Sequence, residues 1–255
     1  MTAMHVRIRL FAMQRELAGT REVAVELPAG ADVAAAWDSL TALHPALAPG
    51  RDSVRFARNG AYADATTPLA DGDEVAMIPP VSGGARGAAA GTRILEIRDE
   101  PFDTGIISEL IDRLATPEDG AAVGFLGRTR VTPGTPAPGQ EAEALRHAGR
   151  AVESLDYEAH DSMAIAVLDT IAGEIAARFG VDRLAIVHRT GDVPLGAASI
   201  AVVAVAAHRD AAFEAARYAI DETKARAPIW KAERFADGHV WIGHPARTGP
   251  EGDAT

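Results

Sequence analysis

The chain has only two lysines, Lys224 and Lys231, among its 25 basic residues, and both lie within one stretch of eight residues. A lysine ammonium is compact and its pKa shifts readily, whereas an arginine guanidinium stays charged. A site that must donate or accept a proton at an amine would therefore keep lysine in a chain that otherwise uses arginine. Codon bias toward arginine, together with chance, would give the same distribution.

The residues around these lysines predict where the amines lie. Pro228 ends the preceding helical pattern, and together with Trp230 it predicts a turn that holds both amines on one side of a cleft. Glu233 would supply a nearby carboxylate, as general acid–base chemistry requires. A favourable interaction with the dipole at a helix C-terminus would explain the presence of a lysine at position 224 without catalysis. This explanation does not apply to Lys231, which lies beyond the expected end of the helix.

A second candidate site is His208-Arg209, where an apolar strand pattern gives way to a helical one. The backbone N–H groups at the start of a helix, with a neighbouring arginine and histidine, favour an anion such as phosphate. In the alternative interpretation, Arg209 pairs with a carboxylate and His208 is a surface residue at the end of the strand.

A third signal is the diglycine Gly83-Gly84, which follows Pro79-Pro80-Val81-Ser82. Glycine has no Cβ, so an extended diglycine can thread a narrow channel and present an acyl group inside the active site of a partner. A Gly-Gly pair inside a linker is more often a flexible joint.

Composition restricts the chemistry further. The chain contains no cysteine, so any sulfur chemistry must use sulfur that the protein does not encode, and no metal or bound cofactor is expected. The net charge of −11 disfavours nucleic-acid and membrane partners, and no apolar run has the length of a membrane helix. Because no secretory signal is visible, we expect a cytoplasmic location.

The length of 255 residues predicts about two domains of α+β class. Residues 1–84 predict the order ββαββ, in which a turn at residues 18–20 joins the first two strands as a hairpin and Asp32 caps the helix. The expected strands of this domain are 6–10, 23–27, 54–58 and 74–78, with a helix from 33 to 43.

The small-residue stretch 85–92 is the expected linker, residues 93–247 the second domain, and 248–255 a disordered tail. Residues 131–150 contain three prolines and three glycines and are expected to form a mobile surface loop. A helix over 210–226 is expected to turn Phe213, Ala216 and Ile220 inward. The other expected elements are helices after Asp103 and over 162–179 and strands at 94–97, 121–130, 152–157, 184–188, 199–206, 233–235 and 240–242.

Residues 4–84 resemble the small-subunit family of molybdopterin synthase, and residues 93–245 resemble the large-subunit family. The motifs that carry the first resemblance are Leu10-Phe11-Ala12, residues 15–19 and residues 69–84. Those that carry the second are residues 124–130, 155–159, 188–191, 208–213 and 224–233. The resemblance implies a fusion in which a ubiquitin-like β-grasp sulfur carrier precedes an α/β hammerhead-type catalytic domain.

The resembled reaction transfers sulfur from a C-terminal glycine thiocarboxylate, here Gly84, to cyclic pyranopterin monophosphate, which forms the dithiolene of molybdopterin. A separate ATP-dependent activating enzyme loads the glycine. A peptide-bonded glycine cannot become a thiocarboxylate, so we expect a processing protease to cleave after Gly84, in the exposed linker. The large-subunit family is dimeric, which implies a homodimer in which each subunit completes the site of its neighbour.

The resemblance also implies roles for individual residues. Lys224 would lie beside the incoming Gly84 terminus and stabilise the thiocarboxylate and the developing oxyanion, while Lys231 would bind or protonate the pterin. His188-Arg189 is assigned to structure or to the subunit interface. The substrate-binding positions of the family fall on Arg128, Thr129, Arg130, His208, Arg209, Lys224, Lys231, Ala232 and Glu233.

Two departures from the family pattern bear on these roles. His160 stands where an aromatic residue is commoner, and the 131–150 segment is longer than the family leads one to expect, which would alter access to the site. Two alternatives stay open. In the first, an uncleaved ubiquitin-like domain is a docking module that recruits the activating enzyme or another sulfur acceptor, and the second domain is catalytic. In the second, the chain is a noncatalytic sensor of a phosphate ligand, which would require both lysines to be dispensable.

Overall fold

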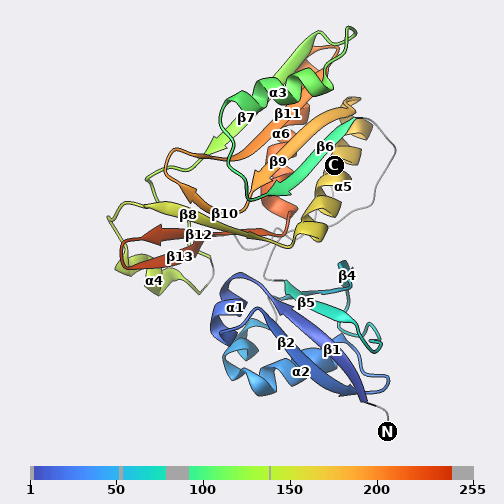
Figure 1. Cartoon of the computed structure of the whole chain (residues 1–255), viewed down its shortest axis with the longest axis vertical. Helices are drawn as coiled ribbons and strands as arrows, with labels where there is room; N and C mark the ends of the chain where they lie inside the picture. Colours follow the sequence, from blue (N-terminus) through green and yellow to red (C-terminus); the bar gives the residue numbers. More distant parts are fainter. Residues whose placement is uncertain (1–2, 52–53, 79–91, 138, 243–255) are drawn as a thin grey trace, which may run out of the picture. The chain divides into compact units, whose positions relative to one another are not determined.

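The computed structural model describes residues 3–51, 54–78, 92–137 and 139–242 (Figure 1). The chain divides into two compact units, residues 1–81 and 82–255. Gly84, the expected linker up to residue 91 and the expected tail at 248–255 lie outside the described residues. The domain boundaries taken from the sequence therefore stay predictions.

The N-terminal unit is a five-stranded sheet of order β2-β1-β5-β3-β4, in which β1 and β5 are parallel and the other neighbours are antiparallel. Its elements are β1 (Ala3–Leu10), α1 (Ala12–Ala18), β2 (Glu22–Pro28), α2 (Val33–Leu43), the 3-10 helix η1 (Pro45–Gly50), β3 (Arg55–Arg58), β4 (Ala61–Ala63) and β5 (Glu74–Ile78).

The core of this unit follows from the alternation that the sequence shows. Val6 and Ile8 of β1 are buried on one face of the sheet, where Trp37 of α2 packs edge-on to Phe56 with ring centroids 6.0 Å apart. The carboxylate of Asp32 accepts a hydrogen bond from the backbone N–H of Ala35 at 3.0 Å, which confirms the predicted helix cap.

The predicted hairpin turn at residues 18–20 is wrong. Strands β1 and β2 do pair antiparallel, but α1 lies between them and ends at Gly19, which adopts the left-handed conformation with φ of 70°. Two turns of helix are too short to show a clear apolar period, so turn residues at its end resembled a hairpin connection. Strand β4 was also not predicted.

The second unit contains two four-stranded sheets, of order β6-β9-β11-β7 and β10-β8-β12-β13. Its helices are α3 (Gly105–Leu114), α4 (Glu141–Arg146), α5 (Asp161–Phe179) and α6 (Arg209–Arg226). Its strands are β6 (Arg93–Arg98), β7 (Ala121–Arg128), β8 (Ser154–Ala159), β9 (Arg183–Arg189), β10 (Gly191–Pro194), β11 (Ala198–Ala206), β12 (Ile229–Phe235) and β13 (Gly238–Ile242).

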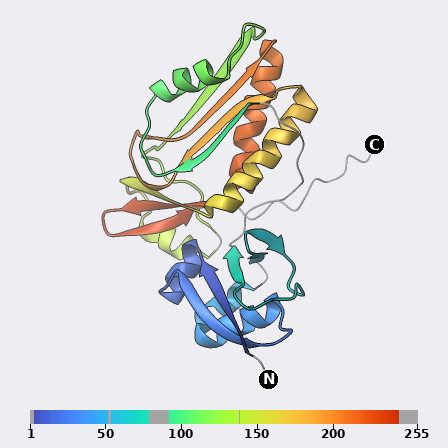
Figure 2. The ribbon, with the colours of Figure 1, turned by 45° about the vertical axis from the view of Figure 1, so that its right-hand side comes forward.

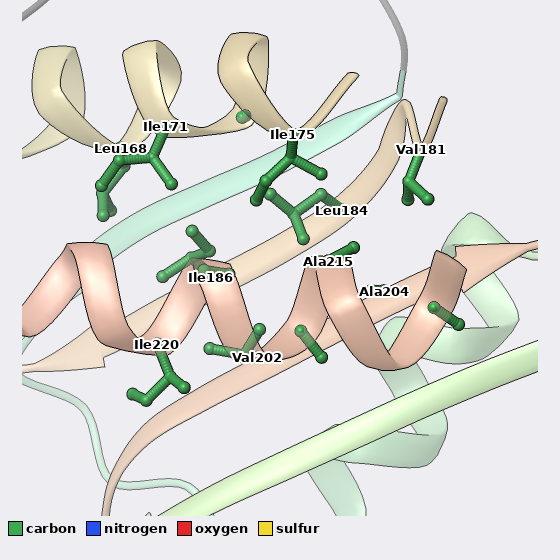
Figure 3. Packing of buried hydrophobic residues seen from close by; sticks show 14 of the residues in the cluster. Leu168, Ile171, Ile175, Val181, Leu184, Ile186, Val202, Ala204, Ala215 and Ile220 are labelled. Atoms are coloured by element: carbon green, nitrogen blue, oxygen red, sulfur yellow. The ribbon is translucent and has the colours of Figure 1, made fainter. Parts of the chain in front are cut away.

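Helices cover both faces of the first of these sheets, with α5 and α6 on one side and α3 on the other (Figure 2). Figure 3 shows Ile171 of α5 and Ile220 of α6 facing Ile186 and Val202 of the two central strands. All nine residues of β11 are buried because the strand is covered on both faces, which explains why Ser199 is its only polar residue. This packing fixes the two ends of α6 relative to the sheet.

One residue expected inside this core is outside it. Phe213 of α6 is 62% exposed, whereas Ala216 and Ile220 are buried as predicted. The buried stripe of the helix is built from small residues, with Ala212 and Ala219 fully covered by α5 and the sheet. The prediction, which was based on hydrophobicity alone, therefore assigned Phe213 to the wrong face of α6.

The segment 131–150 contains regular structure that was not expected. It includes helix α4, and the backbone N–H of Ala137 donates to the carbonyl of Trp241 in β13 at 2.8 Å. Nearby, Pro136 forms an isolated antiparallel bridge with Ile242. The segment is thus held against the second sheet. Within the described ranges, no helix is long and apolar enough to cross a membrane.

Candidate active site

Strand β12 carries two of the candidate residues on one face. It begins at Ile229, directly after a bend at Ala227 and Pro228, so the chain turns earlier than predicted and Trp230 and Lys231 already lie within the strand. Side chains two residues apart on a strand point to the same side, which places Lys231 and Glu233 together. The side chain of Ala232 is buried on the opposite face.

Glu233 is a buried carboxylate with one fixed oxygen. Only 4% of the residue is exposed, and its Oε1 accepts a hydrogen bond from the backbone N–H of Gly134 at 2.8 Å. Its Oε2 is buried and has no hydrogen-bond partner in the described part of the chain. Burial raises the pKa of this carboxyl group, against the opposing effects of the Gly134 hydrogen bond and of the charges on Lys231 and Arg130.

The amine of Lys231 has the opposite shift. Burial lowers its pKa, the positive charges of Lys224 and Arg130 lower it further, and the carboxylate of Glu233 opposes the change. Three cationic side chains and one carboxylate therefore act on one another. Such a cluster suits an anionic ligand and provides a titratable amine beside it.

Lys224 reaches this cluster from the last turn of α6, as the sequence predicts. The residue is exposed, and its Nζ lies 5.9 Å from the ring centroid of Phe125 in β7. An ammonium above an aromatic face is favourably placed and keeps its hydrogens available to a ligand.

Two further residues join the cluster that the sequence did not assign to it. Tyr157 of β8 lies opposite Lys231 in the strand register and packs edge-on to His188 of β9, with ring centroids 5.0 Å apart. Burial, followed by the charge of Glu233, raises the pKa of the Tyr157 hydroxyl against the lowering effect of a hydrogen bond with Ser199.

His188 is a neutral imidazole in this environment. Its Nδ1 lies 2.8 Å from the carbonyl oxygen of Arg189, which can only accept, so Nδ1 carries the proton. Burial lowers the pKa of His188 to about 4, and the charges of Lys224 and Lys231 contribute to the shift. The motifs around Tyr157 and His188 belong to the family resemblance, but only strand pairing reveals that the two rings meet.

The three residues at the end of β7 divide between structure and site. Arg128 donates from Nε to the carbonyl of Gly196 at 2.6 Å, and the hydroxyl of buried Thr129 donates to the carbonyl of Pro194 at 2.5 Å. Both therefore hold the turn between β10 and β11. Arg130 is exposed and acts electrostatically on Lys231 and Glu233.

His208 and Arg209 lie at the opposite end of α6 from Lys224. Both are exposed, and Arg209 Nε is 3.7 Å from the carboxylate of Asp210. At about 1.5 Å of rise per residue, the helix separates Arg209 from Lys224 by roughly 22 Å. A single chain therefore does not bring the predicted phosphate cradle to the lysine cluster.

Two protein-family models match this chain, one in its N-terminal part and one in its C-terminal part. Residues 97–226, just over half of the chain, match the MoaE protein family, and residues 8–84 match the ThiS family. The chain belongs to the MoaE family. The fusion of a small-subunit-like and a large-subunit-like part and the α+β fold with a ubiquitin-like N-terminal domain, both predicted from the sequence, are thereby confirmed.

Relatives of the MoaE domain carry an enzyme name. The molybdopterin synthase catalytic subunit of Oryza sativa subsp. indica is 41% identical over 157 residues, covering 60% of this chain and 74% of the relative. That of Pyrococcus abyssi is 38% identical over 136 residues, covering 53% and 82%. A solved structure of molybdopterin synthase from Staphylococcus aureus aligns with 31% identity and a TM-score of 0.49, covering 58% of this chain and 96% of that chain. This chain is an enzyme with a role in molybdopterin biosynthesis.

Proposed function

We propose that this chain is a molybdopterin synthase that transfers sulfur from a Gly84 thiocarboxylate to cyclic pyranopterin monophosphate. The observation that carries the proposal is the cluster of Lys224, Lys231 and Arg130 around the buried carboxylate of Glu233. Its positive charge fits a phosphate-bearing substrate, and its carboxylate fits ring N–H donors. The name shared by the relatives supports the same reaction.

The two lysines have different roles in this proposal because their environments differ. Lys224 is exposed at the end of α6, where its charge is accessible to the carrier terminus and stabilises the oxyanion that develops there. Lys231 is partly buried and has a lowered pKa, so it is suited to donate a proton to the pterin. The terminal sulfur attacks a ring carbon as the carbon–oxygen bond at that carbon breaks, and the departing oxygen takes the proton of Lys231. Water then cleaves the acyl–sulfur bond, which leaves sulfur on the substrate and returns Gly84 as a carboxylate.

The separation of His208-Arg209 from Lys224 supports a homodimer. In that assembly, His208 and Arg209 of one copy bind the phosphate of a substrate held by the lysine cluster of the other. Residues at opposite ends of one helix then serve two different sites. This role explains why both side chains are exposed in the single chain.

The proposal also requires processing. Gly84 is followed by Ala85 in the sequence, so a protease must release the glycine before an ATP-dependent activating enzyme can load it. An intact mass measurement on protein from its own cells tests this step. We expect a fragment ending at Gly84, part of it heavier by about 16 Da where sulfur replaces oxygen.

Cells that make molybdopterin are the source for this measurement. If their protein is found only in the uncleaved form, the result contradicts the carrier role of the first domain. It would favour a docking role for that domain, with a separate carrier delivering sulfur. The same preparation, supplied with a loaded carrier and cyclic pyranopterin monophosphate, tests the catalytic domain independently. No product under those conditions would contradict the synthase assignment itself.

A further inference from the structure

The segment 131–150 reaches the candidate site through the backbone of Gly134. The N–H of this glycine donates to Oε1 of Glu233 at 2.8 Å, although the two residues are 99 positions apart in the sequence. A residue of the 131–150 segment thus contacts a carboxylate of the lysine cluster. Neither the fold nor the lysine chemistry described above requires this contact.

Other contacts of the segment fix where Gly134 lies. The backbone N–H of Ala137 donates to the carbonyl of Trp241 at 2.8 Å, just beyond the glycine. Further along, the ring of His147 stacks on Phe235 of β12 with centroids 4.4 Å apart. The residues that follow Gly134 in the segment are thus attached to β12 and β13. These attachments hold the glycine N–H in its position against Glu233.

The space around Gly134 also excludes a side chain. A Cβ at this position would lie 3.0 Å from Cγ2 of Ile242 and 3.2 Å from Oε1 of Glu233. Both distances are shorter than ordinary contacts between such atoms. An alanine would therefore push on the carboxylate even though it keeps the N–H, and a proline would remove the donor altogether.

The contact leaves the two oxygens of Glu233 in different states. Oε1 is occupied by Gly134, while Oε2 is buried and without a partner among the described residues. Leaving a buried acceptor unsatisfied is unfavourable, so an acceptor held in this state is suited to a donor that arrives with a ligand. Lys231 and Arg130 act electrostatically on Glu233, and Glu233 acts on Tyr157. Lys224 and Arg130 act on Lys231, and the charges of both lysines also act on His188.

We infer that Gly134 is a positioning residue of the synthase site, whose N–H fixes Oε1 of Glu233 so that Oε2 is presented to an N–H donor of the substrate ring. The identity of the ring rests on the proposed function, whereas the positioning of the carboxylate does not. The 131–150 segment is then part of the site, because it supplies the backbone N–H that orients the Glu233 carboxylate.

A titration of Glu233 in the full-length protein tests this inference without substrate. The carboxyl carbon is followed by ¹³C NMR and assigned by its loss in Glu233→Gln. A hydrogen bond donated to the charged form lowers the pKa of a carboxyl group, so Gly134→Pro should raise the pKa of Glu233 by about one unit. Thr135→Ala, at the exposed neighbouring residue, is the matched control and should titrate as the parent does.

Gly134→Ala provides a second variant in case the proline chain does not fold. It should shift the titration in the same direction by a smaller amount, because the added methyl displaces the carboxylate from its donor. Titration curves of Gly134→Ala and of any folded Gly134→Pro that superimpose on the parent curve would overturn the inference.

Product formation separates this inference from the proposed function. With loaded carrier and cyclic pyranopterin monophosphate, Gly134→Pro should lower kcat/KM about tenfold and move the acidic limb of its pH profile upward, while Thr135→Ala should not. A parent protein that makes no product would contradict the proposed function and leave the titration result standing. Unchanged titration in a protein that does make product would overturn the positioning role alone.

Discussion

Two glutamates of the same domain, Glu174 and Glu233, are held in opposite ways. Both oxygens of Glu174 on α5 accept hydrogen bonds from Arg226, at 2.6 and 2.9 Å, and Tyr218 donates to one of them at 2.9 Å. Burial alone would raise the pKa of Glu174, but these donors outweigh it and the pKa is lowered. Glu233 has a raised pKa and a backbone donor to one oxygen, while its other oxygen is buried and has no hydrogen-bond partner among the residues that the structure describes.

The difference separates a carboxylate that stabilises the fold from one that is kept for a ligand. The Glu174 network has little capacity for another partner, and it joins α5 to α6. Glu233 retains an open acceptor beside a cationic cluster, at a cost in folding free energy that a ligand can offset. Four predictions test this contrast, starting from the largest expected effect.

Replacement of Lys231 should have the largest effect, and on activity alone. Lys231→Met removes the proposed proton donor and should reduce single-turnover product formation at least about 100-fold. Its thermal midpoint should be no lower than that of the parent, because the ammonium is held in the fold at a desolvation cost. Lys231→Arg keeps the charge without a titratable amine, so retained activity in that variant would contradict the proton-donor role.

Replacement of Glu174 should instead reduce stability. Glu174→Ala leaves Arg226 without its principal partner, and we expect a loss of about 2 to 3 kcal/mol in the free energy of unfolding, measured by urea denaturation at pH 7. Glu214→Ala, at an exposed glutamate of α6, is the control and should change it by less than about 0.5 kcal/mol. Product formed per folded molecule should be unaffected.

The effect of Glu174 should also depend on pH. Its folded pKa is lowered, so its stabilisation is present above the unfolded value of 4.5 and is lost as the pH falls through the folded pKa. The difference in the free energy of unfolding between the parent and Glu174→Ala should therefore become smaller at acidic pH. If this difference were as large at pH 3 as at pH 7, the ion pair between Glu174 and Arg226 would not be the source of the stabilisation.

Glu233→Gln should have the smallest effect, with the opposite sign. The folded pKa of Glu233 is raised, so its favourable contribution is complete below the unfolded value of 4.5 and is lost as the pH rises through the folded pKa. Glutamine retains an acceptor for Gly134 and carries no charge. We expect this variant to exceed the parent in stability by about 1 kcal/mol at pH 8 and by nothing measurable at pH 4. Equal differences in the thermal midpoint at the two pH values would contradict the assignment.

Local patterns in the sequence were sufficient for much of the fold. Alternation predicted β1 and β2, Asp32 predicted the start of α2, and Pro228 predicted the end of α6 with Lys224 in its last turn. These features depend on neighbours within a few residues. The position of Phe213 did not follow from local pattern, because the packing of small residues against α5 decided which face of α6 is buried.

The site was less accessible to sequence reasoning because strand pairing creates it. Lys231 and Glu233 were expected near each other, but the contact between Glu233 and Gly134 and the placement of Tyr157 opposite Lys231 come from segments distant in the chain. No periodicity records such pairings. The separation of Arg209 from Lys224 follows from the length of α6, because both residues lie on this one rigid helix, near its opposite ends.

Because lysine is scarce in this protein, reagents that react with side-chain amines can modify it only at the candidate site. Apart from the N-terminus, an amine-reactive probe has two targets in the whole chain, the exposed Lys224 and the partly buried Lys231, and it has no side-chain target in residues 1–84. Any isopeptide bond to a lysine of this chain must form at one of these two positions. A carrier whose electrophilic acyl terminus reacts with a side-chain amine of this chain can therefore attach only beside the candidate site, which makes the attached position a direct report of where the terminus is delivered.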